Sequence, residues 1–241
     1  MAPVPAPARA SYEELYEGIA RNEAEFGDHG VGSGDFATIG EIELDILRSQ
    51  GLEPSSTLVD FGCGNGRLAI HAVPFLVQGT YIGIDIAPSF LEQAGRRLEG
   101  LPTGFCSVRF IHQNNETFAL ADHSVDMICA FSVFTHMEHE DLYRYLVQMK
   151  RVVRRGGTAI ISVLPLDLDV ARTVFLGEAA LDPAARWQRV RNVTTSVDLV
   201  DQIARLAGWT VRGWLPGSAG QAMSAAGELR GLGQSVVILT S

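Results

Sequence analysis

Residues 57–71 read TLVDFGCGNGRLAIH, and residues 81–85 read YIGID. This order predicts a strand, a glycine loop, a helix and a second strand within one βαβ unit. Glycines at positions 62, 64 and 66 permit a tight turn and let the backbone approach a ligand, at a helix N-terminus whose amides point outward. Asp85 ends the second strand, where a carboxylate can accept hydrogen bonds from both hydroxyls of a ribose. The stretch therefore indicates a site for a nucleoside-containing ligand.

Two side chains beside the loop favour one class of ligand. A dinucleotide loop of the GxGxxG kind needs glycine at its sixth position, but this chain has Arg67 there. Asp60, just before the loop, favours a ligand with a cation or an amine, although it could equally cap the strand end or bind the loop's own amides. Arg67 itself is expected to face solvent on the first helical turn. S-adenosylmethionine fits these features better than NAD does.

Outward from this unit, short β-branched runs alternate with helical segments, as in a parallel sheet with crossover helices. Strands are expected at 57–61, 80–85, 107–111, 125–130, 158–163, 209–215 and 235–240. Helices are expected at 66–77, 88–98, 138–153 and 196–208, with Gly156-Gly157 ending the third of them. The predicted fold is α/β: a doubly wound, mainly parallel seven-stranded sheet with an antiparallel terminal strand pair and a helical N-terminal cap.

The chain divides into three parts. Residues 1–10 alternate proline with small residues and are expected to form a disordered leader. Residues 11–54 are expected to form the helical cap, with a Ser11–Glu14 capping box opening a helix to about residue 26 and a second helix at 36–50. Residues 55–241 form the main domain, and their less regular stretch 165–193 is expected to cover a second substrate.

Composition limits the partners and the compartment. A formal net charge of −9 disfavours nucleic acid as a substrate. Apolar runs are far shorter than a bilayer span and the N-terminus lacks a secretion signal, so a cytoplasmic protein without membrane contact is expected. The three cysteines form no close CxxC pair, and no His, Asp and Glu cluster has the spacing of a metal site, so no metal is expected. Nothing in the sequence indicates an oligomeric state.

Residues 59–66, Val-Asp-Phe-Gly-Cys-Gly-Asn-Gly, match the form hh-D-hG-x-G-x-G, the first motif of the class I S-adenosylmethionine-dependent methyltransferases, and the chain resembles that family. Three later segments are similar to the family's fourth strand and loop, its helix, glycine turn and fifth strand, and its last helix and sixth strand. They read SVDMICAFSVFTHM (124–137), MKRVVRRGGTAIISV (149–163) and SVDLVDQIARLAGWTVRGW (196–214). The resemblance covers roughly residues 55–241, which makes 165–193 an insertion that covers the methyl acceptor.

The resemblance implies which residues hold the cofactor. The loop from Gly62 to Gly66 would cradle the methionine part, Asp85 would take the ribose, and Asn114 or Asn115 would reach the adenine. Asn114 stands where many relatives have aspartate, which is a departure from the family's pattern. The expected cofactor-binding residues are Asp60, Phe61, Gly62, Cys63, Gly64, Gly66, Asp85, Ile86, Asn114, Asn115 and Phe131. The product of methyl transfer would be S-adenosylhomocysteine.

His136 is the candidate for catalysis, because it follows the fourth strand, where the open end of such a sheet meets the reactive methyl. With an ordinary pKa of about 6.5, it could take a proton from a hydroxyl or an ammonium. It could equally cap the following helix or pack as a neutral core residue. The residues that could contact the acceptor are Tyr12, Tyr16, His29, Phe175 and Trp187. The alternative for each of them is that it packs in the fold or lies on the surface without a role in binding.

The expected activity is therefore methyl transfer to the hydroxyl of a small molecule, an O-methylation that could belong to specialised metabolism. An N-methyltransferase acting on a small-molecule amine is the nearest alternative. A module that binds S-adenosylmethionine without transferring a methyl group is the alternative outside catalysis. An NAD-dependent reductase is disfavoured by Arg67.

Overall fold

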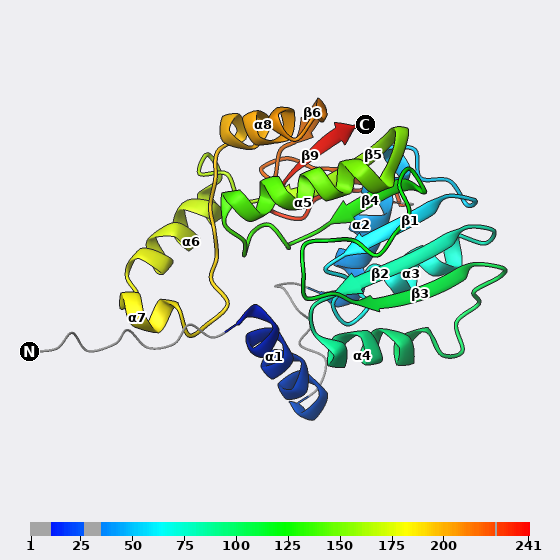
Figure 1. Ribbon diagram of the computed structural model, residues 1–241, viewed down its shortest axis with the longest axis horizontal. Coiled ribbons are helices and arrows are strands. Elements are labelled where there is room, and N and C mark those ends of the chain that lie inside the picture. The colour runs from blue at the N-terminus through cyan, green and yellow to red at the C-terminus, as the bar shows by residue number, and fades with distance from the viewer. Residues whose placement is uncertain (1–10, 27–34, 225) are drawn as a thin grey trace, which may run out of the picture.

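The computed structural model describes residues 11–26, 35–224 and 226–241, and a seven-stranded sheet forms its centre (Figure 1). The strands lie in the order β3 (Ser107–His112), β2 (Thr80–Asp85), β1 (Thr57–Phe61), β4 (Val125–Ala130), β5 (Val153–Val163), β9 (Ser235–Thr240) and β6 (Thr210–Leu215). Neighbours are parallel from β3 to β5, whereas β9 is antiparallel to both β5 and β6. The predicted mainly parallel sheet with an antiparallel terminal pair is confirmed.

The strand order reverses at β1, which pairs with β2 on one side and β4 on the other. Crossovers on either side of such a point leave the sheet in opposite directions, so a crevice opens at the carboxyl ends of the strands. Register places Asp60 beside Gly83 of β2 and Cys129 of β4. The acid that precedes the glycine loop therefore lies at the crevice, between two buried strands.

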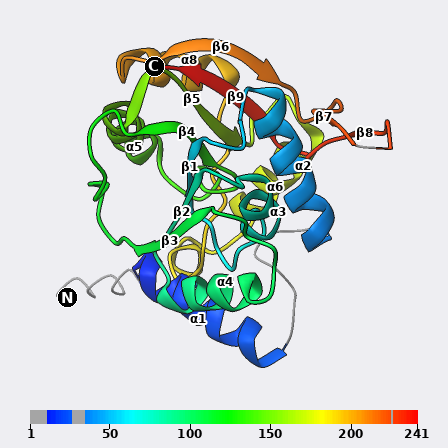
Figure 2. The same cartoon turned by 90° about the vertical axis from the view of Figure 1, so that its right-hand side faces the viewer.

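Helices cover both faces of the sheet, as Figure 2 shows. On one face α5 (His139–Val152) and α8 (Val197–Leu206) bury Leu146 and Val200 completely. On the other face α2 (Phe36–Ser49) and α3 (Ala69–Phe75) bury Ile46 and Val73. Among the described residues, no helix has the length and apolar character needed to cross a membrane.

The two N-terminal helices take different places. α1 (Tyr12–Phe26) packs against α4 (Pro88–Leu98), where Ala20 meets Phe90, whereas α2 lies on the sheet beside α3. The Ser11–Glu14 capping box is confirmed, because the Ser11 amide donates to the Glu14 carboxylate at 3.0 Å and the Glu14 amide donates to Ser11 Oγ at 3.2 Å. The predicted leader 1–10 and the loop 27–34, with His29, lie outside the described residues.

Two helix boundaries differ from the prediction. α3 begins at Ala69 rather than at 66, because residues 64–68 continue the turn that leaves the glycine loop. α5 ends at Val152 and β5 begins at the next residue, so Gly156-Gly157 lies inside the strand rather than ending a helix. A side chain at Gly157 would place its Cβ 2.7 Å from the Asp126 carbonyl, which explains glycine at that position by close strand approach.

The stretch 165–193 is more regular than the sequence pattern indicates. It contains α6 (Asp169–Ala179) and the short α7 (Pro183–Arg186). In Figure 1 both helices lie at the edge of the molecule, on the same side as the beginning of α1. A small hairpin of β7 (Ala222–Met223) and β8 (Leu229–Arg230), which the pattern does not predict, precedes β9.

Candidate functional site

A cavity of about 620 Å³ opens where the carboxyl ends of β1, β2 and β4 meet. This volume lies in the usual range for small-ligand sites, about 300–1,000 Å³. Nearly all the residues expected to bind the cofactor line it, together with both tyrosines of α1 and the candidate base. They are Asp60, Phe61, Gly62, Cys63, Gly64, Asp85, Ile86, Asn114, Asn115, Phe131, Tyr12, Tyr16 and His136.

The glycine loop owes its shape to positions that only glycine fills without strain. Gly62 has φ +75°, and a Cβ there would overlap the Val133 side chain on the opposite wall. Gly66 has φ +94° and lies outside the cavity lining; a Cβ there would sit 3.1 Å from Ala94 of α4. Gly62 therefore keeps the cavity open, whereas Gly66 lets the loop pack against the neighbouring helix.

Asp85 is buried at the end of β2 and braces the loop as well as facing the cavity. Its two carboxylate oxygens accept hydrogen bonds from the Gly64 amide at 2.8 Å and the Ala87 amide at 2.9 Å. Burial raises the pKa of Asp85, and these amide hydrogen bonds oppose that rise. Each oxygen keeps a further lone pair, so the residue retains the capacity to accept ribose hydroxyls.

Asn114 and Asn115 follow β3 at the exposed side of the cavity. Asn114 Nδ2 donates to Glu13 of α1 at 3.2 Å, and Asn115 Oδ1 accepts from the Thr117 amide at 2.9 Å. Both amides thus have a protein partner and also line the cavity. Their contact with adenine stays a prediction.

Asp60 is buried at the end of β1 and hydrogen-bonds to side chains of the two flanking strands. Tyr81 Oη donates to Asp60 Oδ2 at 2.6 Å, and Cys129 Sγ approaches Oδ1 at 3.7 Å. These contacts, rather than the amides of the glycine loop, hold the carboxylate. Burial raises its pKa to about 7, against the lowering effect of the Tyr81 hydrogen bond. A cationic ligand in the cavity would favour the charged form.

Arg67 does not face solvent, so that expectation is wrong. Its side chain is 15% exposed and pairs with Glu43 of α2, with Nη2 2.6 Å from Oε1 and Nε 3.3 Å from Oε2. Glu43 is 2% exposed and lines the same cavity. Sequence reasoning missed Glu43, although its spacing from Gly40, Ile46 and Leu47 places an acid on the buried face of an amphipathic helix.

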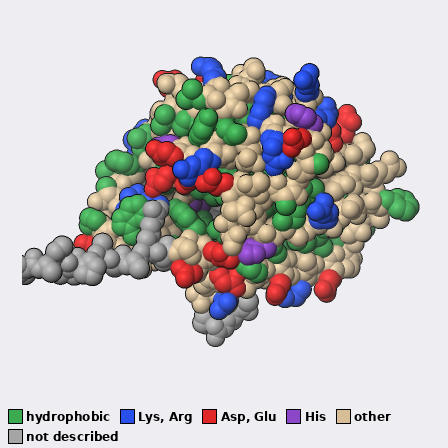
Figure 3. All heavy atoms as spheres, viewed as in Figure 1, with side chains coloured by type: hydrophobic (Ala, Val, Ile, Leu, Met, Phe, Trp, Pro, Cys, Tyr) green, Lys and Arg blue, Asp and Glu red, His purple; other side chains and the backbone are tan. Residues whose placement is uncertain are grey.

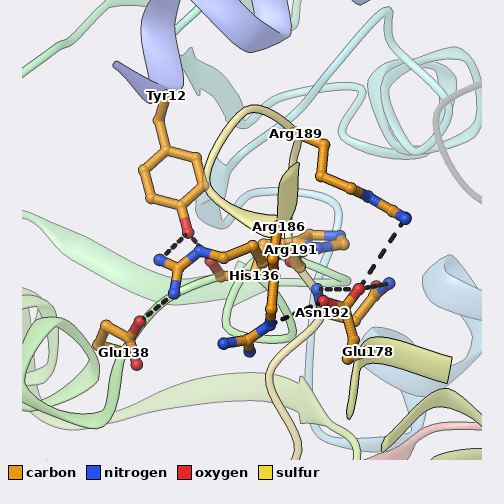
Figure 4. A network of polar contacts seen from close by, with 8 residues as sticks. All are labelled: Tyr12, His136, Glu138, Glu178, Arg186, Arg189, Arg191 and Asn192. Atoms are coloured by element: carbon orange, nitrogen blue, oxygen red, sulfur yellow. Dashed lines mark hydrogen bonds and ion pairs between the residues drawn. The ribbon is translucent and has the colours of Figure 1, made fainter. Parts of the chain in front are cut away.

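His136 lines the cavity beside Tyr16, whose ring meets it edge-on at 6.3 Å between centroids. Its Nδ1 lies 2.8 Å from the Arg191 carbonyl oxygen, and Tyr12 Oη donates to the His136 carbonyl (Figure 4). Burial lowers the pKa of His136, partly opposed by the Arg191 hydrogen bond and by Glu178. The ring is therefore neutral near pH 7, and no described residue hydrogen-bonds to its Nε2.

The cavity wall after β4 contains a second feature that the sequence does not indicate. Ser132 adopts φ +60°, a conformation that is costly for a residue with a side chain. Ser162 Oγ accepts from the Ser132 amide at 2.7 Å and donates to Gln234 Oε1 at 2.7 Å, and Gln234 Nε2 returns to Ser132 Oγ at 3.0 Å. This closed set of hydrogen bonds fixes the strained loop that carries Val133 and His136.

The other residues expected at the acceptor lie elsewhere. Phe175 is about half exposed on α6, and neither it nor Trp187 lines the cavity. Trp187 stacks on the Arg191 guanidinium, with Cζ 3.9 Å from the ring centroid. Arg186 and Arg191 pair with Glu178 and Glu138, so the protein already neutralises both of these charges. Within the described parts of the chain, no group of three or more His, Cys, Asp or Glu is placed to hold a metal ion.

Comparison with known proteins identifies relatives of both the sequence and the fold. Residues 58–157 match a family described as a methyltransferase domain. The ribosomal protein L11 methyltransferase of Photobacterium profundum is 31% identical over 151 residues, covering 61% of this chain and 48% of that protein. An uncharacterised 37.1 kDa protein of a Streptomyces fradiae transposon is 33% identical over 121 residues, covering 50% and 32%. The chain thus spans less than half the length of these curated relatives.

Solved structures share the fold along almost the whole chain. The magnesium protoporphyrin IX methyltransferase of Synechocystis, solved with bound S-adenosylhomocysteine, matches with a TM-score of 0.65 at 17% identity, covering 95% of this chain and 97% of that one. The comparisons therefore show that residues 58–157 are similar to a methyltransferase domain, and that the fold is the one found in methyltransferases of known structure.

Proposed function

We propose that the protein transfers a methyl group from S-adenosylmethionine to the hydroxyl of a small molecule. The observation that carries this proposal is the position of His136, which lines the same cavity as the glycine loop, with its Nδ1 against the Arg191 carbonyl and no described residue bonded to its Nε2. A hydroxyl must lose its proton as its oxygen attacks, and a neutral imidazole is suited to take that proton.

The residues present fit the cofactor. Gly62 leaves space against Val133, Asp85 faces the cavity with free lone pairs, and Asp60 offers a carboxylate to an ammonium. Asn114 and Asn115 supply amides on the side of β3. S-adenosylmethionine, when bound here, supplies a methyl group on a sulfonium that a nucleophile can take directly. The chain's own contribution is to hold, to align and to exclude water.

Within that arrangement, Tyr12, Tyr16 and His136 form the wall that an acceptor would meet. Aromatic rings exclude water and position a small apolar ligand. The Nε2 atom of His136 would accept the proton as the new bond forms and release it to solvent afterwards. The reaction balances with one methyl group gained by the acceptor and one proton lost from it.

A small-molecule amine is the second candidate, and the charges of the cavity favour it. Among the described residues, five acids line the cavity, namely Glu43, Asp60, Asp85, Glu116 and Asp141, and the one lining lysine or arginine is Arg67. Since Arg67 is paired with Glu43, the remaining field attracts cationic ligands and repels anionic ones. We therefore expect neutral or cationic acceptors and poor turnover of carboxylates or phosphates.

The names of the relatives do not agree on an acceptor, because they include a ribosomal protein, a small RNA and magnesium protoporphyrin IX. A small molecule is proposed from the cavity volume and from the charge of the chain. On the face shown in Figure 3, acidic and basic side chains lie next to one another rather than forming one basic surface. Such a face does not favour a nucleic acid.

The test is to incubate the protein with S-adenosylmethionine and panels of hydroxyl, amine and carboxylate compounds, and to measure S-adenosylhomocysteine and methylated product by mass. With a hydroxyl acceptor, replacing His136 by Gln should reduce kcat about 10²–10⁴-fold, the usual contribution of a general base. The rate of the unchanged protein should fall as the pH drops through the lowered His136 pKa, because the protonated ring cannot accept a proton.

His139, three residues further on α5, provides the matched control, because it does not line the cavity. A His139→Gln variant should keep the rate and the pH profile. Equal rates for the two variants across the pH range would remove His136 from the mechanism. Cofactor binding without product from any acceptor would support a binding module in place of an enzyme.

A further inference from the structure

Arg191 is a buried cation outside the helices and strands, and its side chain contacts Glu138, Tyr12 and Trp187. Its side chain is 3% exposed and forms an ion pair with Glu138. Its Nη2 donates to Tyr12 Oη at 3.0 Å, and its Cζ lies 3.9 Å from the centre of the Trp187 ring. The guanidinium therefore joins the start of α1 to the residue that precedes α5, and Figure 4 shows it between Tyr12 and Glu138.

The main chain of the same segment bonds to the loop that carries His136. The Arg191 carbonyl lies 2.8 Å from His136 Nδ1, and the Val193 amide donates to the Thr135 carbonyl at 2.7 Å. A carbonyl oxygen only accepts hydrogen bonds, so Nδ1 must carry the proton. In the neutral ring the lone pair then lies on Nε2, and no described residue donates a hydrogen bond to that atom.

The segment is also fixed from behind. Glu178 of α6 is buried and accepts from the Asn192 amide and from Asn192 Nδ2, both at 3.1 Å, and from Arg186 Nε at 3.0 Å. Arg189 reaches the same carboxylate at 3.9 Å. This anchorage restrains the Arg191 carbonyl, and so the acceptor of the histidine proton is held in place by α6.

From these contacts we propose that Arg191 is a positioning residue: its carbonyl sets the tautomer of His136, and its side chain clasps α1 and Glu138 around the ring. The proposal rests on the proposed function, in which His136 Nε2 takes the proton of the acceptor. It adds that the insertion 165–193, which contributes no cavity-lining residue, acts through the base rather than by touching a substrate.

The tautomer is measured directly, without any methyl acceptor, by ¹⁵N NMR of the histidine-labelled protein, with His136→Gln to assign the signals. The expected spectrum has His136 protonated at Nδ1 and unprotonated at Nε2 near neutral pH. A ring protonated at Nε2 would overturn the proposal. This measurement needs no turnover. A failed search for an acceptor would therefore contradict the proposed function but would not affect the result for the tautomer.

The role of the side chain is tested by Arg191→Met combined with Glu138→Gln, which removes both charges and leaves no unpaired ion buried. The expected result is a mixture of His136 tautomers and a titration midpoint that moves up toward the ordinary value as water reaches the ring. Groups that face the ring, and so share in this titration, are Tyr12 and Tyr16 of α1, Glu138 before α5, Glu178 of α6 and Arg191 itself.

With an acceptor in hand, kcat of the double variant should fall about 10–100-fold, the scale of a misaligned catalytic group, while the Kd for S-adenosylmethionine changes less than about threefold. Tyr12→Phe removes one hydroxyl and should shift the midpoint in the same direction by less. Arg172→Gln is the control and should change neither quantity, because Arg172 lies in the same insertion but is about half exposed and pairs with Asp169 rather than with Glu178. A double variant that is folded, by its dispersed NMR spectrum, and keeps the wild-type tautomer and midpoint would refute the clasp.

Discussion

The buried carboxyl of Asp60 affects both the stability of the fold and the charge of the cavity. Its carboxyl lies between β2 and β4, and burial raises its pKa to about 7, well above the ordinary value of 3.8. An acid with a raised folded pKa stabilises the fold at low pH and loses that advantage as the pH rises through the folded value. Above pH 7 the protein without cofactor therefore buries a charged carboxylate at a cost in stability, and a bound cationic ligand would reduce that cost.

Replacing Asp60 by Asn should separate these two effects. The unfolding free energy at pH 8 should rise, by at most about 4 kcal/mol at 1.4 kcal/mol per pKa unit, whereas the affinity for S-adenosylmethionine should fall about 10–100-fold. Wild-type affinity should itself weaken from pH 8 to pH 6 as Asp60 gains a proton, and the variant should lack this dependence. Calorimetric binding at both pH values decides; parallel pH profiles would mean that Asp60 does not meet the ammonium.

Some residues of the site can be predicted from the sequence and others cannot. Asp60, Asp85 and His136 each stand at or just after a buried strand, and parallel strands bring such ends together, so local pattern suffices to find them. Arg191 cannot be found in this way. Its partner Tyr12 is 179 positions away, and in the sequence Arg191 resembles any other arginine of an irregular stretch.

At the scale of elements, α1 matters because it contributes Tyr12 and Tyr16 to the cavity and docks on α4. Ala20 is fully buried against Phe90 of α4, Gln93 Nε2 donates to the Ala20 carbonyl at 2.8 Å, and the Ser89 amide donates to Glu17 at 3.2 Å. The helix period predicts α1, but not its docking site, because an amphipathic face does not specify which neighbour it covers.

Ala20→Leu should weaken this docking, because extra methylenes in a tight contact typically cost about 1–3 kcal/mol. Because α1 packs on α4 outside the sheet, we expect a small change in thermal stability and a larger loss of cofactor affinity, about tenfold for 1.4 kcal/mol. Gly18→Ala is the matched control on the same helix: a Cβ at position 18 meets nothing within 4 Å and should stabilise α1 by about 0.5–1 kcal/mol. Unchanged affinity in Ala20→Leu would mean that α1 does not close the site.

At the scale of the whole molecule, the sequence predicts the sheet well but does not predict the contacts between the helices and the loops that cover it. Alternating strand and helix patterns predict the sheet and its antiparallel end, since those patterns are local. The join between α2 and the glycine loop depends instead on Glu43 and Arg67, 24 residues apart. An arginine on a first helical turn has no local feature that distinguishes a solvated side chain from a buried ion pair.

The Glu43–Arg67 ion pair should therefore stabilise the packing of α2 against the glycine loop. Arg67→Met leaves Glu43 buried without its cation and should lower the unfolding free energy by about 3–5 kcal/mol at pH 8. Burial already raises the pKa of Glu43, and loss of Arg67 raises it further. A raised folded pKa makes stability greater at low pH, so the deficit should be smaller at pH 5.5 than at pH 8, because more of Glu43 is protonated at the lower pH. The double variant Arg67→Met with Glu43→Gln should recover most of the loss at pH 8. Urea denaturation of the three proteins at both pH values measures this, and a deficit independent of pH would show that the arginine stabilises the loop by packing and not by its charge.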